Sequence, residues 1–238
     1  MKWNLHQLTR TVPLLIAQGE AGELIREFSG RIYSNRISYL LRRDNAGVHG
    51  LPEAKIPIVV RPIRNDDIPI ILQERSVRVA ALESGLSTCY VATTEQNEIC
   101  YMQWLIDSTQ NELVARQFKG LCPPLSKNEM LLEWAYTFKK FRGFGIMGRA
   151  MAQISAKGAE AGARWLFTYV AVDNVASLKG CKNAGFRPFQ IRTEKWWCLR
   201  SVASFEDLPA DAKYPFEEAQ DSKHASPVGP QQIASTAR

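Results

Sequence analysis

Three closely spaced glycines, Gly143, Gly145 and Gly148, mark a junction that strongly constrains how this chain can fold. Residues 130–138, just before them, are apolar and aromatic, as in a buried strand. After them, small and apolar residues recur at helical spacing to about Ala161. A strand that turns through glycines into a helix is typical of α/β folds. The start of such a helix suits a phosphate, because unpaired backbone N–H groups and the positive end of the helix dipole lie there.

Strand and helix signals alternate on both sides of this junction. β-branched and aromatic runs predict strands, and apolar residues at steps of three and four predict helices. The expected elements are a strand at 58–60, a helix at 68–86, hairpin strands at 88–92 and 99–106, a polar connection at 107–128, a strand at 130–138, a helix to about 161, a strand at 164–172, a short helix at 174–185 and a last pair of strands at 186–202. This order predicts an α/β fold with an antiparallel first half.

Two segments of different composition flank this region. Residues 1–54 interleave leucines and isoleucines with arginines, which predicts a basic amphipathic helical extension. Its part at 24–43 could lie on an anionic membrane surface, or pack on the domain with its arginines in solvent, which we favour. Either arrangement would give it a docking or dimerising role. Residues 208–238 are rich in Pro, Ala, Ser and Gln and predict a flexible tail.

Charge and cysteine content narrow the partners. The chain has 30 Lys and Arg against 24 Asp and Glu, a net charge of +6. This excess favours a small anionic partner but is too mild to predict nucleic-acid binding. The five cysteines contain no CxxC pair, so free thiols in a reducing compartment are expected. All three histidines, His6, His49 and His224, lie outside the central region, so neither a histidine triad nor a metal site is expected.

Hydropathy favours a cytoplasmic location. No segment approaches the roughly 18 consecutive apolar residues that cross a bilayer. Peripheral attachment to the inner membrane face through the basic extension remains an alternative.

The glycine loop by itself allows several interpretations. It lacks the Gly-Lys-Ser/Thr of a P-loop. Its spacing matches the dinucleotide-binding pattern G-x-G-x-x-G, and Asp173 follows the next strand. However, the charged residues Lys139, Lys140 and Arg142 approach the first glycine, and an antiparallel hairpin precedes it. A turn that merely begins a helix is the remaining alternative.

Together with a second motif, the loop resembles the GNAT superfamily of N-acetyltransferases. Motif A of that superfamily is a strand followed by Q/R-x-x-G-x-G/A, which Lys140, Gly143 and Gly145 match with lysine in the first position. The second signature is Asn-x-x-Ser/Ala, an aromatic residue four positions later, and then Gly-Phe. The matching residues here are Asn174, Ser177, Gly185 and Phe186, with Cys181 at the aromatic position. The resemblance spans about Ile58 to Arg200. More narrowly, the segments 136–138 and 177–181 are similar to GNAT proteins of bacterial polysaccharide clusters.

The resemblance implies a GNAT domain at 58–203. Its sheet would be mixed and mostly antiparallel, flanked by helices, and splayed at the central parallel pair of strands that hold Glu133 and Phe167. The pantetheine arm of acetyl-CoA would lie in the gap. The cofactor-binding residues implied are Tyr136, Thr137, Phe138, Lys140, Phe141, Arg142, Gly143, Phe144, Gly145, Ile146, Met147, Asn174 and Ser177.

Acetyl transfer to an amine also needs a base and a proton donor. Glu133 is the candidate base: it sits in an apolar strand, where burial would raise its pKa towards neutrality. An outward-facing glutamate is the alternative. Cys181 stands where many family members have a tyrosine acid, and a packed thiol is the alternative there. Tyr169 is a second candidate donor.

The expected activity is transfer of an acetyl group from acetyl-CoA, by direct attack, to the primary amine of a small molecule. The narrower resemblance suggests an amino sugar as acceptor. The segments at 76–87 and 107–128 are expected to form the acceptor side. Their residues do not indicate which substrate is bound. Two alternatives are a non-catalytic acyl-CoA-binding module within a biosynthetic assembly and a transferase for longer acyl chains.

Overall fold

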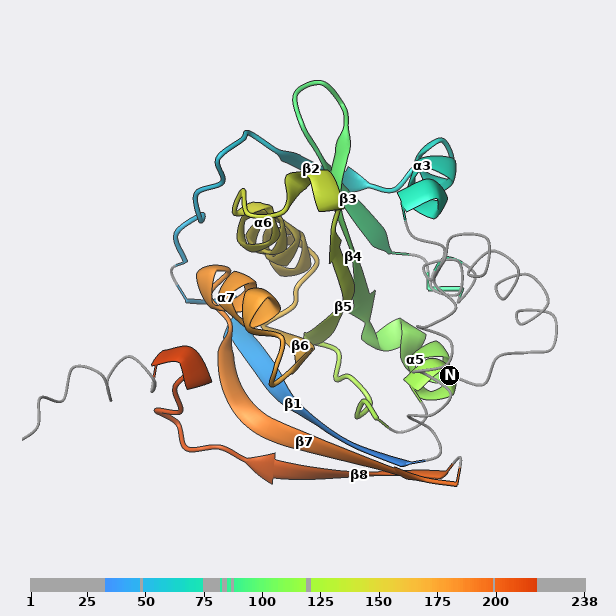
Figure 1. Cartoon of the computed structure of the whole chain (residues 1–238), viewed down its shortest axis with the longest axis vertical. Coiled ribbons are helices and arrows are strands. Elements are labelled where there is room, and N and C mark those ends of the chain that lie inside the picture. The colour runs from blue at the N-terminus through green and yellow to red at the C-terminus, as the bar shows by residue number, and fades with distance from the viewer. Residues whose placement is uncertain are drawn as a thin grey trace, which may run out of the picture.

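The computed structural model describes residues 33–47, 49–74, 82, 85–86, 88–118, 121–198 and 200–217. In this part of the chain, eight strands form one sheet in the order β2-β3-β4-β5-β6-β1-β7-β8 (Figure 1). The strands are β1 (Tyr33–Asp44), β2 (Val59–Pro62), β3 (Cys89–Thr93), β4 (Ile99–Asp107), β5 (Glu129–Thr137), β6 (Trp165–Ala171), β7 (Arg187–Trp197) and β8 (Arg200–Asp207). The helices are α3 (Asp67–Glu74), α5 (Asn111–Phe118), α6 (Ile146–Glu160) and α7 (Val175–Asn183), with 3-10 turns η2 (Ser108–Gln110) and η3 (Lys139–Phe141).

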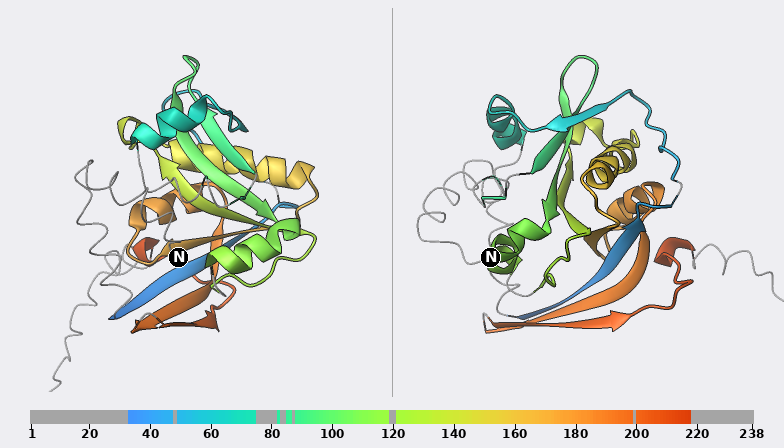
Figure 2. Two further views of the ribbon diagram at one scale, coloured as in Figure 1. Left: turned by 90° about the vertical axis from the view of Figure 1, so that its right-hand side faces the viewer. Right: turned by 180° about the vertical axis from the view of Figure 1, so that it is seen from behind.

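Helices cover both faces of the sheet. α6 and α7 lie together on one face, while α3 and α5 lie on the other (Figures 1 and 2). α6 begins in the glycine loop and buries Ile146, Met151 and Ile154 in the core. The expected α/β architecture is confirmed.

The sheet opens at its centre, as the resemblance implies. β5 and β6 form its parallel pair, and they are in register only from Glu129 opposite Trp165 to Leu131 opposite Phe167. Beyond these residues the two strands diverge (Figure 1). A β-bulge lies where they part: β4 residues 102 and 104 face β5 residues 136 and 133, so β5 carries one extra residue. Trp134 takes up that residue with a φ of 54°, and such a bulge bends the strand.

Strand β1 corrects the expectation of a helical extension over residues 1–54. It lies inside the sheet, antiparallel to both β6 and β7. Ile37 and Tyr39 alternate with the polar residues Arg36 and Ser38, which is a strand period, and Leu40 and Leu41 are buried. Residues 1–32 lie outside the described part.

The arginines of β1 differ in exposure: Arg36 and Arg42 are exposed, whereas Arg43 is buried. Arg43 is 8% exposed and donates a hydrogen bond of 2.7 Å to the Ala184 carbonyl oxygen. The Arg42 guanidinium lies 5.3 Å from the centre of the Trp165 ring. Docking through residues 24–43 stays a prediction, and of these residues 33–43 belong to a strand and not to the expected helix.

Two further expectations need correction. The polar connection at 107–128 contains η2 and α5, which begin where the Asp107 side chain accepts a hydrogen bond from the Thr109 backbone N–H. In the expected tail, Tyr214 is 2% exposed and its hydroxyl donates to the Phe186 carbonyl oxygen. Residues 208–217 therefore pack on the domain, whereas 218–238 lie outside the described part. α3 accounts for the beginning of the helix expected at 68–86.

Candidate active site

The glycine loop requires glycine for conformational and steric reasons. Gly143 and Gly145 have φ angles of 79° and 76°, which L-residues rarely adopt. A Cβ atom on Gly145 would also lie 2.9 Å from the Glu53 carbonyl oxygen. Gly145 is the N-cap of α6, so this backbone path presents the start of α6 at the surface.

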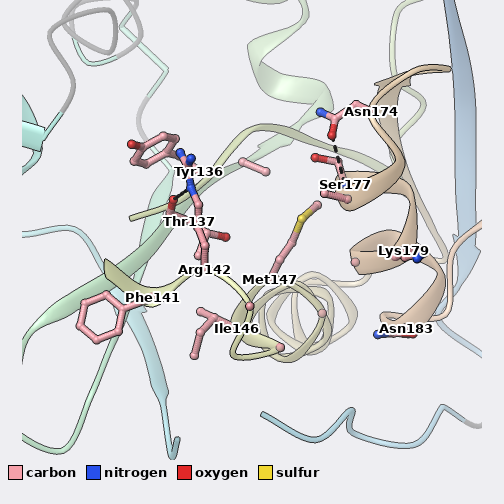
Figure 3. A pocket seen from close by; sticks show the side chains of 16 residues that line it. Tyr136, Thr137, Phe141, Arg142, Ile146, Met147, Asn174, Ser177, Lys179 and Asn183 are labelled. Carbon is pink, nitrogen blue, oxygen red and sulfur yellow. Dashed lines mark hydrogen bonds between the residues drawn. The ribbon is translucent and has the colours of Figure 1, made fainter. Parts of the chain in front are cut away.

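A cavity of about 620 Å³, the loop cavity, lies between this loop, the end of β5 and the start of α7 (Figure 3). Its lining residues are Ala135, Tyr136, Thr137, Phe141, Arg142, Gly143, Gly145, Ile146, Met147, Gly148, Asn174, Ala176, Ser177, Lys179, Gly180 and Asn183. The lining includes the cations Arg142 and Lys179 but no carboxylate. The N-terminal ends of two helices add positive dipole ends. The cavity is therefore suited to a polyanion.

Contacts with neighbouring elements hold the loop in place. The Arg142 Nε donates to the Thr137 carbonyl oxygen at 3.3 Å, and its guanidinium lies 5.6 Å from the Tyr136 ring centre. Glu74 at the end of α3 accepts hydrogen bonds from the Tyr136 hydroxyl and the Lys139 backbone N–H. On the other wall, Asn174 caps α7 by accepting from the Ser177 N–H at 3.2 Å (Figure 3).

Ten of the thirteen residues expected to bind the cofactor line this cavity. The other three are Phe138, Lys140 and Phe144. Lys140 is directed to the β3–β4 hairpin, where its Nζ lies 2.8 Å from Glu98 Oε1. Phe138 is buried, and Phe144 is exposed with the Lys55 ammonium 5.9 Å from its ring centre.

The sequence interpretation missed the cavity-facing side of α7. Lys179, Gly180 and Asn183 lie three, four and seven residues after Ala176, which places all four on one face of a helix. That spacing, counted from Ala176 in the first turn of α7, could have identified Lys179 as a second cation for the cavity.

A second cavity of about 660 Å³, the Glu133 cavity, lies across the sheet opening. Its lining residues are Asn35, Arg36, Ile37, Ser38, Phe118, Leu121, Cys122, Glu133, Tyr169, Ala171, Val172, Asp173, Arg192 and Glu194. Unlike the loop cavity, it carries three carboxylates, which outnumber its two arginines, Arg36 and Arg192, so it can accept a ligand with a cationic group. Asp173 lines this cavity and the adjacent Asn174 lines the loop cavity. The two cavities thus approach each other where β5 and β6 diverge.

Tyr169 and Cys122 lie together in the Glu133 cavity. The Arg192 guanidinium lies 4.3 Å from the centre of the Tyr169 ring. Burial, followed by the nearby Cys122 sulfur, raises the pKa of Tyr169 above its usual value. Burial, followed by the negative charge of Glu133, raises the pKa of the Cys122 thiol to about 12. Both groups are therefore protonated at neutral pH.

Cys181, the candidate acid, lines neither cavity. It is 0% exposed, and its sulfur lies 3.9 Å from the Met151 sulfur of α6. Burial and, to a smaller extent, the Glu133 charge raise the pKa of this thiol. The geometry agrees with the packing alternative, and Tyr169 is the candidate donor that faces a cavity.

No cluster of His, Cys, Asp and Glu side chains that could hold a metal ion occurs among the residues that the structure describes. Within the same residues, no helix combines the length and the apolar character needed to cross a bilayer.

No family model and no curated protein matches the sequence. Among solved structures, the chain is similar to a GNAT-family acetyltransferase from Colwellia psychrerythraea, with 12% identity and a TM-score of 0.50. It is also similar to a GCN5-related N-acetyltransferase from Sphaerobacter thermophilus, with 10% identity and a TM-score of 0.49. These matches cover 75% and 77% of this chain but only 59% and 56% of those proteins. At this identity the likeness to the Colwellia psychrerythraea protein shows the fold alone, which is that of the GNAT acetyltransferases.

Proposed function

We propose that this chain, which has the GNAT fold, is an N-acetyltransferase that moves an acetyl group from acetyl-CoA to the primary amine of a small molecule. One observation carries the proposal. A glycine-lined cavity with cations and no carboxylate approaches, at the opening of the sheet, a cavity in which three carboxylates outnumber two arginines. The first is suited to a nucleotide pyrophosphate and the second to an amine.

The loop cavity supports the binding of acetyl-CoA. The N–H groups at the start of α6 would receive the pyrophosphate, because the first turn of a helix has no acceptors for them. Arg142 and Lys179 would neutralise its charge. Ala135 to Thr137 continue the cavity along β5 towards the opening, which leaves the pantetheine arm a path that ends near Glu133.

The residues of the Glu133 cavity fit direct transfer. The acceptor ammonium would give a proton to the Glu133 carboxylate, and the neutral nitrogen would attack the thioester carbonyl carbon. A C–N bond forms, the C–S bond breaks, and the departing CoA sulfur takes a proton, for which the protonated Tyr169 hydroxyl is the candidate donor. The acetylated nitrogen then loses its second proton, which restores Tyr169, and Glu133 releases the first proton to water. The raised pKa of Cys122 leaves no thiolate to form an acetyl-cysteine, which favours attack by the amine itself.

A non-catalytic acyl-CoA-binding module is the second candidate function. It is favoured by the burial of Cys181, which leaves no acid at the position where the related signature has an aromatic residue. Such a module would bind acetyl-CoA without turnover of any amine. The activity test below separates the two.

Calorimetric titration with acetyl-CoA tests the cofactor site. The wild type should bind, and a Gly143→Glu, Arg142→Ala variant should bind at least tenfold more weakly, because it places a carboxylate beside the pyrophosphate and removes one cation. Lys140→Ala is the matched control: this neighbouring cation is paired with Glu98 outside the cavity, so binding should persist. A folded wild type that does not bind would refute the proposal.

Release of free thiol from acetyl-CoA in the presence of amines tests catalysis. Glu133→Gln should lower kcat/KM by 10²- to 10⁴-fold, the usual range for a general base, with acetyl-CoA affinity unchanged. Binding without turnover by the wild type would instead support the non-catalytic module.

A further inference from the structure

A smaller, apolar cavity of about 170 Å³ adjoins the Glu133 cavity and shares Cys122 and Tyr169 with it. We call it the arm cavity. Its lining residues are Leu40, Cys122, Pro123, Pro124, Leu125, Glu129, Leu131, Phe167, Tyr169, Phe189 and Gln190. The proposed transfer chemistry makes no use of it.

Strand register shows that the two cavities follow one another along one face of the sheet. Directly paired residues project to the same face, and so do residues two apart on one strand. Leu40 is paired with Tyr169 and with Gln190, and two residues along β1 Ser38 is paired with Arg192. On β5, Leu131 of the arm cavity is two residues from Glu133, a separation of about 7 Å along the strand. Together the cavities form one groove with a charged end and an apolar end.

The arm cavity has few polar side chains that could form hydrogen bonds with a ligand. The two most polar side chains in its lining, Glu129 and Gln190, are engaged elsewhere: Glu129 accepts from the Ser126 N–H at 2.9 Å, and Gln190 donates to Asp207 at 2.6 Å. Phe167 and Phe189 form part of the wall, with ring centres 5.6 Å apart. A cavity of about 150 Å³ lined by aliphatic and aromatic side chains stays dry and accepts benzene, so this volume holds a group about the size of a phenyl ring.

The outer wall of the groove is held in place. Asn111 exchanges two hydrogen bonds of 2.8 Å with the backbone of Leu125, and Arg192 donates one of 2.9 Å to the Leu121 carbonyl oxygen. These contacts fix both ends of the segment that carries Cys122 and the two prolines. A ligand would therefore meet a preformed groove.

We propose that the acceptor is a primary amine on an apolar arm, with the amine beside Glu133 and a ring or short alkyl chain in the arm cavity. This inference rests on the proposed function and names its substrate class. A hydroxyl-rich amino sugar, suggested by the narrower sequence resemblance, fits less well, because its hydroxyl groups would lose water at the apolar end without new partners.

A graded series of amines tests the inference in the thiol-release assay at fixed acetyl-CoA. The series is ethylamine, butylamine, hexylamine, 2-phenylethylamine and glucosamine. kcat/KM should rise along the alkyl series, and 2-phenylethylamine should exceed both ethylamine and glucosamine by ten- to a hundredfold, the range expected for filling an apolar pocket. Equal rates for all amines, or a preference for glucosamine, would overturn the inference and leave the transferase proposal standing.

A pair of variants at Leu125 tests whether the preference for apolar amines arises in the arm cavity. Leu125→Trp fills the arm cavity and should abolish the preference for 2-phenylethylamine while ethylamine is still acetylated. Leu125→Ala widens the cavity and should retain the preference. Unchanged acetyl-CoA affinity shows that both variants are folded.

Direct binding covers the case in which no amine is acetylated. 2-Phenylethylamine should then still bind the full-length protein in a calorimetric titration, and Leu125→Trp should weaken that binding at least tenfold. Absence of binding to the wild type, or equal binding to the variant, would overturn the inference independently of the proposed activity.

Discussion

At the scale of single residues, Asp67 ties the start of α3 to strand β2. Its carboxylate accepts two hydrogen bonds from the Arg61 guanidinium, at 2.6 and 2.9 Å, and one from the Arg64 backbone N–H. The Asp67 side chain is only 7% exposed. The hydrogen bond with Arg61 is the largest cause that lowers the pKa of Asp67 below its usual value.

A lowered pKa means that Asp67 stabilises the folded state above the unfolded-state pKa, near 4, and loses this effect as the pH falls through the folded-state pKa. Asp67→Asn should therefore lower the free energy of unfolding by about 1–3 kcal/mol at pH 7. The difference from the wild type should shrink below about pH 4. Urea unfolding at pH 7, 5 and 3 measures it.

Glu160→Gln is the control for this prediction, because Glu160 pairs with Lys157 on the surface of α6, where ion pairs contribute little. A constant difference between Asp67→Asn and the wild type at all three pH values would contradict the ionic explanation.

The same scale shows which site residues a sequence can reveal. Gly143, Gly145 and Asn174 were predictable, because positive φ angles and helix caps depend on local backbone chemistry. The placement of Lys140 was not, because its partner Glu98 comes from a hairpin 42 residues away. Nor was the burial of Cys181, since it depends on how α7 packs against α6.

At the scale of elements, helices α6 and α7 pack closely against each other at two glycines, Gly148 and Gly180. A Cβ atom on Gly148 would lie 3.0 Å from the Asn183 Cβ and 3.4 Å from the Gly180 carbonyl oxygen. A Cβ atom on Gly180 would lie 2.7 Å from the sulfur of Met147, which lines the loop cavity. One substitution would therefore press on the Asn183 Cβ, which cannot move without its backbone, and the other on the flexible side chain of Met147.

These two contacts lead to opposite expectations. Gly148→Ala should destabilise the fold by about 1–3 kcal/mol, because the two helices must move apart. Gly180→Ala should change stability by less than about 1 kcal/mol, since alanine favours the helix and Met147 can move. Met147 would move into the loop cavity, so acetyl-CoA affinity should fall. Thermal unfolding and calorimetry of both variants test the contrast, and equal loss of stability would contradict it.

Most elements were predictable from the sequence, because their apolar residues recur with a clear strand or helix period, as in β4 and α6. Strand β1 was not predictable, because its arginines lie next to leucines and imitate an amphipathic helix, although Ile37 and Tyr39 alternate with the polar Arg36 and Ser38. Its position depends on pairing with β6 and β7, more than 120 residues away, which no local pattern encodes. α5 was missed because it is short and four of its eight residues are polar.

At the scale of the whole molecule, the C-terminal segment clamps the wall of the loop cavity. The Tyr214 and Phe216 rings stack with centres 5.2 Å apart. The ammonium groups of Lys179 and Lys182 lie 5.7 and 5.6 Å from the Phe216 ring centre. Glu217 forms an ion pair with Lys182. Residues from the end of the described chain thus contact the same helix that contributes Lys179 to the cavity.

Substitutions at Tyr214 test this clamp. Tyr214→Ala should reduce the free energy of unfolding by about 3 kcal/mol, the usual effect of removing a buried aromatic ring, and should also weaken acetyl-CoA binding. Tyr214→Phe keeps the ring and loses only the hydrogen bond to Phe186, so a loss of about 1 kcal/mol is expected. Urea unfolding and calorimetry measure both effects. A Tyr214→Ala variant as stable as the wild type would show that the segment is dispensable.

The central place of β1 also has a consequence for how the chain folds as it is made. Arg42 is synthesised about 125 residues before its partner Phe167, an interval of roughly 6 to 25 s at ordinary translation rates. During that time the apolar Leu40 and Leu41 have no sheet to enter, and a β-pairing of such large sequence separation forms slowly. The nascent chain therefore exposes an unpaired strand until its C-terminal half emerges, and that is the stage at which chaperones would protect it from aggregation.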